Sequence, residues 1–380
     1  MTKRVGLLGP YSSRNLGDTA IQGAVIARLR KHDADIEPIG ICPEPDDTRR
    51  THGIQAFPLE PHSGRACGTR ILSLAKIFAF VGTLDALIIS GGGQLDEFWG
   101  GPWGHPFSLW AWTWCASLRG VPVAVLGVGL DRIDTRLSRL FVGSVLKRAR
   151  YRAFRDWRTL DHLRTLGLRA PSEVCPDLAF TLDRNGRTPV HLPAAPYAIV
   201  SPIAAATWTH DAAEEDEPYF AACASASIWL MNRGLRVRFV CTQSKMDRSA
   251  VERVTALIDE RYDGRWEVRD IEGVDAYLQE ARAARVVLAS RLHGAILAFV
   301  AGTPVVAVAP LPKVSQLMLE LDLSQCCMDL RDVSITGLVA RLEYTLHHET
   351  AMREHIRART AHWRAALDEV FTRMTAALAL

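Results

Sequence analysis

Short apolar runs alternate with longer helical patterns along most of the chain, and this alternation restricts the fold more than any other feature. In the first half, the runs at 5–8, 86–90 and 121–126 predict buried strands, and the pattern over about 18–30 predicts a helix. Such alternation is typical of β-α units on a parallel sheet. The first part of the chain is therefore predicted to be an α/β domain.

A second series of the same kind follows the polar, proline-containing stretch 183–196. Its expected strands are 198–202, 237–241, 286–289 and 305–308, and its expected helices are 215–232, 248–262 and 275–284. The fold class is thus two α/β domains in tandem, over 1–185 and 196–349. Residues 350–380 place apolar side chains at helical spacing and predict a long amphipathic helix that packs on a domain or on a partner.

The stretch 43–68 is rich in Pro, His, Gly and charged residues, and it predicts an irregular connection between elements. The length of 380 residues agrees with two or three domains of about 150 residues each. The stretch 98–118 is uncharged, but glycines and prolines interrupt it. It is therefore not predicted to cross a membrane.

Charge and cysteine content exclude several classes of protein. The 45 Lys and Arg residues against 42 Asp and Glu give a net charge of +3, which argues against a polybasic nucleic-acid binder. The eight cysteines form no Cys-x-x-Cys pair, so neither a zinc site nor a disulfide framework is expected. The N-terminal apolar run is too short for a secretory signal, so a cytoplasmic location with reduced thiols is expected.

The loop after the first predicted strand, residues 9–18, carries polar groups to a helix start. Asp18 has an ordinary explanation as the helix N-cap, with Asn15 forming the turn and Gly17 supplying a permissive backbone. A carboxylate at this position repels anions. If the loop binds a ligand, that ligand is expected to carry hydroxyl groups rather than phosphate.

Three glycines, 91–93, directly follow the apolar run 86–90. Consecutive glycines cost conformational entropy, which favours a site where the backbone approaches a ligand over a plain turn. Asp96 and Glu97 come next and are candidates for a general base that deprotonates a hydroxyl. Solvated loop carboxylates are the alternative interpretation.

Half of the ten tryptophans lie within sixteen residues of one another. Aromatic faces beside carboxylates are typical of sugar-binding sites, and a buried interface between the two domains explains the cluster equally well. The five are Trp99, Trp103, Trp110, Trp112 and Trp114.

The segment 286–294 reads as a buried strand, then Ser-Arg-Leu-His-Gly, then a helix start. In extended geometry Arg291 and His293 would point the same way, toward one spot over the helix N-terminus. A guanidinium binds carboxylate or phosphate with two hydrogen bonds, and an imidazole transfers protons near neutral pH. Arg155, near an earlier strand end, and Lys313, after the strand 305–308, are expected to add positive charge.

These segments together resemble the polysaccharide pyruvyl transferase family. They occur in the family's order over roughly residues 5 to 320, and each is weak alone. They are Asn15-Leu16-Gly17-Asp18, Ser90-Gly91-Gly92-Gly93, Arg155-Asp156 followed by Leu163-Arg164-Thr165-Leu166-Gly167, Pro176-Asp177-Leu178-Ala179-Phe180, and Ser290-Arg291-Leu292-His293-Gly294 with Gly302-Thr303-Pro304 and Pro312-Lys313.

The resemblance implies two Rossmann-like domains facing across a cleft, as in the glycosyltransferase B architecture. It also implies phosphoenolpyruvate as donor, a sugar or glycan as acceptor, and a role in polysaccharide biosynthesis of the bacterial cell envelope. No cofactor or metal is expected, because arginines can neutralise the donor. A lipid-linked acceptor, peripheral membrane contact and a homodimer through the C-terminal helix are left open.

The expected site divides into three sets of residues. His293 is the candidate general acid, and Asp96 or Asp18 is the candidate base. The donor-binding set is Arg291, Arg155, Lys313, Leu292 and Gly294. The acceptor-binding set is Asn15, Gly92, Gly93, Trp99 and Trp103.

Two positions depart from the family pattern. The serine that usually follows the Arg-Asp pair is Thr159, and the Gly-Gln-Gly after the fourth strand is Gly127-Val128-Gly129. The second change leaves the acceptor less certain than the donor. Two rival functions are a glycosyltransferase that uses a nucleotide-sugar donor and a carbohydrate-binding protein without catalysis.

Overall fold

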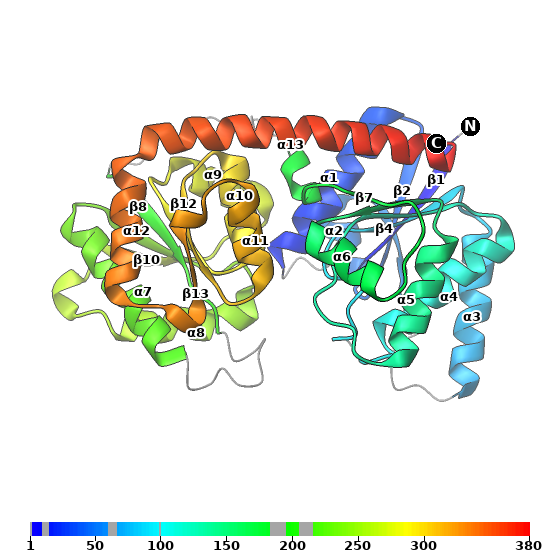
Figure 1. Ribbon diagram of the computed structural model, residues 1–380, viewed down its shortest axis with the longest axis horizontal. Helices are drawn as coiled ribbons and strands as arrows, with labels where there is room; N and C mark the ends of the chain where they lie inside the picture. The colour runs from blue at the N-terminus through cyan, green and yellow to red at the C-terminus, as the bar shows by residue number, and fades with distance from the viewer. Residues whose placement is uncertain (1, 10–14, 60–66, 99, 183–194, 205–215) are drawn as a thin grey trace. The chain divides into compact units, whose positions relative to one another are not determined.

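A computed structural model describes residues 2–9, 15–59, 67–98, 100–182, 195–204 and 216–380. The chain divides into two compact units (Figure 1). The first consists of 1–13, 18–182 and 363–380, and the second consists of 14–17 and 183–362. They are called the first and second domain below. No helix within the described ranges is long and apolar enough to cross a bilayer.

The first domain is built on a parallel sheet of seven strands in the order β3-β2-β1-β4-β5-β6-β7. The strands are β1 (Lys3–Leu8), β2 (Ile36–Cys42), β3 (Gln55–Pro58), β4 (Ala86–Ser90), β5 (Val123–Val128), β6 (Tyr151–Phe154) and β7 (Glu173–Val174). The helices between them are α1 (Leu16–His32), α2 (Pro45–His52), α3 (Cys67–Val81), α4 (His105–Arg119), α5 (Arg136–Arg148) and α6 (Trp157–Thr165).

The second domain repeats this design with a parallel sheet of six strands in the order β10-β9-β8-β11-β12-β13. The strands are β8 (Tyr197–Ser201), β9 (Arg236–Val240), β10 (Trp266–Arg269), β11 (Val287–Ala289), β12 (Val305–Ala309) and β13 (Cys327–Asp329). The helices are α7 (Asp216–Asn232), α8 (Ser244–Ala256), α9 (Val274–Ala283), α10 (Leu292–Ala301), α11 (Pro312–Glu320) and α12 (Ile335–His347).

The central strands of both sheets are almost entirely apolar and buried. The strands β4, β5, β8, β11 and β12 are buried at every position, as expected when helices cover both faces of a parallel sheet. In each sheet the strand order reverses direction at one place, between β1 and β4 in the first and between β8 and β11 in the second. Ligands of open α/β sheets bind at the carboxyl edge beside such a reversal.

Two sequence predictions of local structure are wrong. The stretch 43–68 is not an irregular connection throughout, because it contains α2 and β3. Its Pro45 occupies the first turn of α2, where a missing backbone N–H costs nothing, and Gly53 ends that helix in the left-handed conformation. The helix predicted at 248–262 ends at Ala256, and 260–262 form a separate turn capped by Asp259.

The predicted C-terminal helix is present as α13 (Glu349–Leu378), the long red helix of Figure 1. Its first part belongs to the second domain, where Arg353 donates hydrogen bonds to the carbonyls of Gly302 and Ala284. Its last part belongs to the first domain, where Trp363 packs edge-on against Phe180 at 4.7 Å between ring centroids. The helix therefore packs on both domains of its own chain.

Candidate active site

Arg291 and His293 lie beside the strand reversal of the second sheet. Strand β11 ends at Ala289, and α10 begins at Leu292 with Arg291 as its N-cap residue. The expectation that Arg291 and His293 share one extended strand is therefore wrong, because His293 is already the second residue of the helix. Both residues still stand at the helix N-terminus, where backbone N–H groups and the helix dipole favour anions.

The guanidinium of Arg291 is held by the carboxylate of Asp247 in α8. Its Nε donates to Oδ1 at 2.8 Å and to Oδ2 at 2.9 Å, and Nη2 lies 2.6 Å from Oδ1. The Asp247 side chain is fully buried and that of Arg291 is 13% exposed. Contact along one edge of the guanidinium fixes the plane of the group.

The turn that carries Arg291 is anchored on both sides by tyrosine hydroxyls. Tyr219 of α7 shares a hydrogen bond of 2.7 Å with Ser290, and Tyr277 of α9 donates to the Gly294 carbonyl at 2.9 Å. Leu292 is 8% exposed. These contacts explain Leu292 and Gly294 as structural parts of the turn, and their predicted donor contacts stay predictions.

The ring of His293 packs against the N-terminus of α1. A Cβ atom on Gly17 would stand 2.1 Å from Nδ1 of His293, so only glycine leaves room for the imidazole. Asn15 accepts a hydrogen bond from the Gly17 amide at 3.0 Å and thus caps the helix. The interpretation of Asp18 as the N-cap is wrong, since Asp18 lies in the first turn of a helix that already starts at Leu16.

Lys313 stands at the same carboxyl edge as Arg291, one strand further along the sheet. It is the second residue of α11, which begins with Pro312 after β12. Strands β11 and β12 are hydrogen-bonded neighbours. The second domain therefore presents two cationic side chains and an imidazole at adjacent helix N-termini.

The first domain presents its glycine-rich turn at the end of β4. Gly91 and Gly92 have φ angles of 64° and 67°, which L side chains rarely adopt. A Cβ atom on Gly91 would also approach Ile21 to 2.3 Å, while one on Gly92 would lie 3.9 Å from Oδ1 of Asp18. Gly91 is thus explained by packing, and Gly92 opens the backbone beside the Asp18 carboxylate.

Asp96 holds the loop that follows β5. Its Oδ1 accepts hydrogen bonds from the backbone amides of Asp131 at 2.5 Å and Arg132 at 3.0 Å, and the side chain is buried. A Cβ atom on Gly93 would stand 2.6 Å from Oδ2, so Gly93 makes room for this carboxylate. Asp96 therefore holds the loop after β5 in place, and its predicted role as a base stays a prediction.

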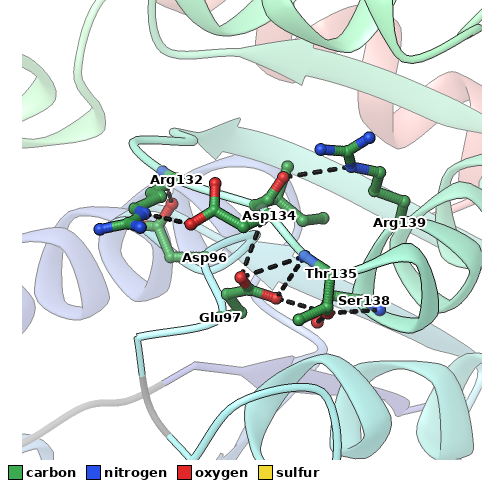
Figure 2. Close-up of polar contacts among 8 residues, drawn as sticks. Asp96, Glu97, Arg132, Asp134, Thr135, Ser138 and Arg139 are labelled. Carbon is green, nitrogen blue, oxygen red and sulfur yellow. Dashed lines mark hydrogen bonds and ion pairs between the residues drawn. The ribbon is translucent and has the colours of Figure 1, made fainter.

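Glu97 organises the start of α5 (Figure 2). It accepts hydrogen bonds from the amides of Asp134 and Thr135 and from the Thr135 hydroxyl, at 2.7 to 3.2 Å. Partial burial raises the pKa of Glu97, but the hydrogen bonds from Ser138, Thr135 and Asp134 more than offset it and lower the pKa to about 2. A carboxylate with so low a pKa is a weak base, so Glu97 is better explained as a structural anchor.

Replacing Glu97 with glutamine is expected to destabilise the first domain by about 1 kcal/mol near neutral pH, allowing for solvent screening. Because the pKa of Glu97 is depressed in the folded state, its stabilisation is present above the ordinary pKa of 4.5 and is lost as the pH falls toward about 2. The gap between wild type and Glu97→Gln should close over this range in urea unfolding. Glu37→Gln, at a partly exposed ion pair, is the control. A gap that does not change with pH would contradict the assignment.

Arg155 follows β6 and is buried among carboxylates. Its Nε lies 3.4 Å from Oδ2 of Asp156. Burial lowers the pKa of Arg155, but the charges of Asp177, Asp156, Asp131 and Asp96 more than offset this and hold it above its ordinary value. The guanidinium therefore balances the acidic groups of its own domain, and its expected contact with a donor stays a prediction.

The tryptophan cluster belongs mainly to the core of the first domain. Trp112 is fully buried, and Trp110 stacks on Trp114 with 5.7 Å between ring centroids. Trp103 is 44% exposed and makes edge contacts with two phenylalanines. Trp99 lies outside the described residues. The predicted contact of Trp103 with an acceptor stays a prediction.

The residues around the two departures from the family pattern have local structural roles. The backbone of Gly127 has a φ angle of 63°, and a Cβ atom on Gly129 would stand 2.4 Å from a guanidinium nitrogen of Arg155. The Thr159 hydroxyl accepts a hydrogen bond from the Leu130 amide at 3.1 Å. These residues therefore shape the β5 loop around Arg155, and threonine supplies the hydroxyl that serine would.

Two parallel-sheet α/β domains, each with polar loops at its strand reversal, give the chain a glycosyltransferase B-like fold. Similar solved structures include a glycosyltransferase from Rickettsia africae, with a TM-score of 0.65, 12% identity and 98% coverage of both chains. Anabaena HepE in complex with UDP has a TM-score of 0.65, 12% identity and 99% coverage of both. The Neisseria meningitidis UDP-GlcNAc 2-epimerase bound to UDP-GlcNAc has a TM-score of 0.64, 8% identity and 99% coverage of both.

The chain belongs to the polysaccharide pyruvyl transferase family, whose model matches residues 15–312. It is therefore a transferase that acts on polysaccharide. Among curated proteins, none matches the sequence. The matched range contains all of the expected site residues except Lys313, which follows it directly.

Proposed function

We propose that the protein transfers the enolpyruvyl group of phosphoenolpyruvate onto two hydroxyls of a sugar acceptor and releases phosphate. The observation that carries this proposal is the Arg291 guanidinium, fixed at the N-terminus of α10 with His293 two residues further along. This pair suits a small anionic substrate that must also receive a proton, because the guanidinium binds the anion and the imidazole donates the proton. Membership of the polysaccharide pyruvyl transferase family supports transfer of a pyruvyl group.

The donor carries a carboxylate and a phosphate, so it requires more than one positive group. Arg291 binds one of the two, Lys313 supplies a second charge from the neighbouring α11, and the helix N-termini add their dipoles. Leu292 and Gly294 shape the turn through which the backbone meets the donor. Arg155 of the first domain is a further candidate for donor binding, in addition to balancing the four carboxylates around it.

In the proposed reaction, His293 protonates the methylene carbon of phosphoenolpyruvate and leaves a cationic carbon beside the ester oxygen. A sugar hydroxyl attacks that carbon and gives up its proton to a carboxylate base. The carbon–phosphate ester bond then breaks, and a second hydroxyl closes the ketal. The bond that breaks is the C–O bond of the phosphate ester. One hydroxyl proton replaces the proton that His293 gave to the new methyl group, and the other leaves on hydrogen phosphate, so the equation balances.

Asp18 suits the role of base better than Asp96 does. Asp96 is buried, and its Oδ1 already accepts two backbone hydrogen bonds that hold the loop after β5. Asp18 is half-buried in the first turn of α1, beside the open backbone of Gly92. We propose that Asp18 receives the acceptor proton, and that Gly92, Gly93, Asn15 and the exposed ring of Trp103 form the acceptor side.

The test is to incubate the protein with phosphoenolpyruvate and a panel of sugar conjugates, both lipid-linked and free. The expected result is phosphate release that depends on the acceptor, together with a product that carries one pyruvyl ketal. Two of the similar structures contain UDP or a UDP-sugar, so UDP-sugars form a parallel arm. Glycosyl transfer from a UDP-sugar, or sugar binding without phosphate release, would replace the proposal.

A further inference from the structure

Asp247 is an acidic residue of the second domain that lies outside the segments through which the sequence resembles the family. Its side chain is fully buried and contacts Arg291 through both oxygens. We infer that Asp247 is the positioning residue of the donor site, which orients Arg291 directly and His293 through the loop before α8. This inference rests on the proposed function.

The direct link is the ion pair with Arg291. A carboxylate that contacts both Nε and Nη2 restricts rotation of the guanidinium about its own axis, whereas a surface partner would leave it mobile. The Asp247 carboxylate cannot move aside, because Oδ2 also accepts a hydrogen bond from the Gln243 amide at 2.8 Å. The direction of Arg291 is thus set before any donor binds.

The indirect link runs from the same loop to the imidazole. The Thr242 carbonyl accepts a hydrogen bond from the Leu16 amide at 3.2 Å, and Gln243 forms an antiparallel bridge with Asn15. This pairing holds the N-terminus of α1 in place, where Gly17 packs directly against the His293 ring. The two motifs that are farthest apart in the sequence therefore meet through the loop that Asp247 secures.

This arrangement gives a different task to part of the first motif. Asn15 and Gly17 are predicted to contact the acceptor or to form a permissive turn. In the structure, the Asn15 side chain caps α1 and the missing side chain of Gly17 makes room for the imidazole. Gly17 therefore makes room for the predicted general acid, and Asn15 caps the helix turn that carries Gly17.

The test compares Asp247→Asn with wild type in phosphoenolpyruvate turnover and in calorimetric binding of phosphoenolpyruvate. Misplaced binding groups cost up to about 100-fold, so we expect kcat/KM to fall about 100-fold, with a higher KM. The double variant with Arg291→Gln should bind phosphoenolpyruvate no more weakly than Arg291→Gln alone, because Asp247 acts through that arginine. Glu280→Gln, which breaks a partly buried ion pair with Arg238 in the same domain, is the matched control and should leave KM unchanged.

A second variant, Gly17→Ala, tests the indirect link without touching the ion pair. The new methyl group should displace the imidazole, so kcat falls at least tenfold while binding of phosphoenolpyruvate is retained. Gly23→Ala in the same helix is the control, because a Cβ atom there meets only ordinary contacts at 3.6 Å.

A wild type that neither binds nor converts phosphoenolpyruvate overturns the proposed function and this inference with it. An active wild type with unchanged kinetics in Asp247→Asn, or with additive effects in the double variant, overturns the role of Asp247 alone.

Discussion

Replacing His293 with alanine is expected to lower turnover of phosphoenolpyruvate by about 10²- to 10⁴-fold, the usual contribution of a general acid. The ring lies at the N-terminus of α10 and packs against Gly17, so its removal takes away the proton donor without disturbing Arg291. Binding of phosphoenolpyruvate should therefore persist in calorimetry. Incorporation of solvent deuterium into the methyl group of the product should slow in parallel with phosphate release.

The matched control for this variant is His347→Ala. His347 is an exposed histidine of the same domain. It lies in the last turn of α12, a different helix from the one that carries His293. It should retain full turnover. A His293→Ala protein that also kept full turnover would remove the general-acid assignment.

Replacing Arg155 with methionine is expected to destabilise the first domain by about 3 to 5 kcal/mol. Methionine retains most of the volume, but the carboxylates of Asp177, Asp156, Asp131 and Asp96 lose the cation that balances them. The result should be a lower midpoint of urea unfolding. Intrinsic fluorescence is a suitable probe, because seven of the ten tryptophans belong to this domain: Trp99, Trp103, Trp110, Trp112, Trp114, Trp157 and Trp363.

Arg158→Met tests whether the loss of stability comes from removing a buried arginine or from removing any arginine charge beside these carboxylates. Arg158 bonds to Asp131 at 3.3 Å, yet its side chain is 40% exposed, so its loss should cost at most about 1 kcal/mol. Equal stability of Arg155→Met and wild type, with binding of phosphoenolpyruvate abolished, would contradict the structural role and favour a direct donor contact instead.

The sequence predicts the central strands well, because strands buried on both faces are continuous apolar runs. Strands β1, β4, β5, β8, β9, β11 and β12 lie within two residues of their predicted positions. The pattern does not reveal α2 and β3, since the helix consists largely of charged residues and the strand has only four positions. Edge elements of this kind are defined by their neighbours in the fold rather than by their own composition.

The candidate site is also predicted only in part. The sequence identifies Arg291 and His293 as site candidates, because they follow a buried strand at the start of a helix. The relative orientation of the two side chains cannot be predicted from the sequence, because it depends on whether the helix starts one residue earlier or later. Asp247 lies 44 positions from Arg291 in an otherwise ordinary amphipathic helix. Only the fold brings these two charges together, so no local pattern could have identified the partner.

Helix α13 has a consequence for the order in which the protein can be completed. Its buried residues Leu367, Val370 and Met374 belong to the first domain, whose sheet is otherwise finished by Val174. Arg364 also donates to the carbonyls of Phe180 and Leu182, which are left without this donor until the helix arrives. A ribosome therefore synthesises the whole second domain before it delivers the segment that closes the first, so the domain begun first is the one completed last.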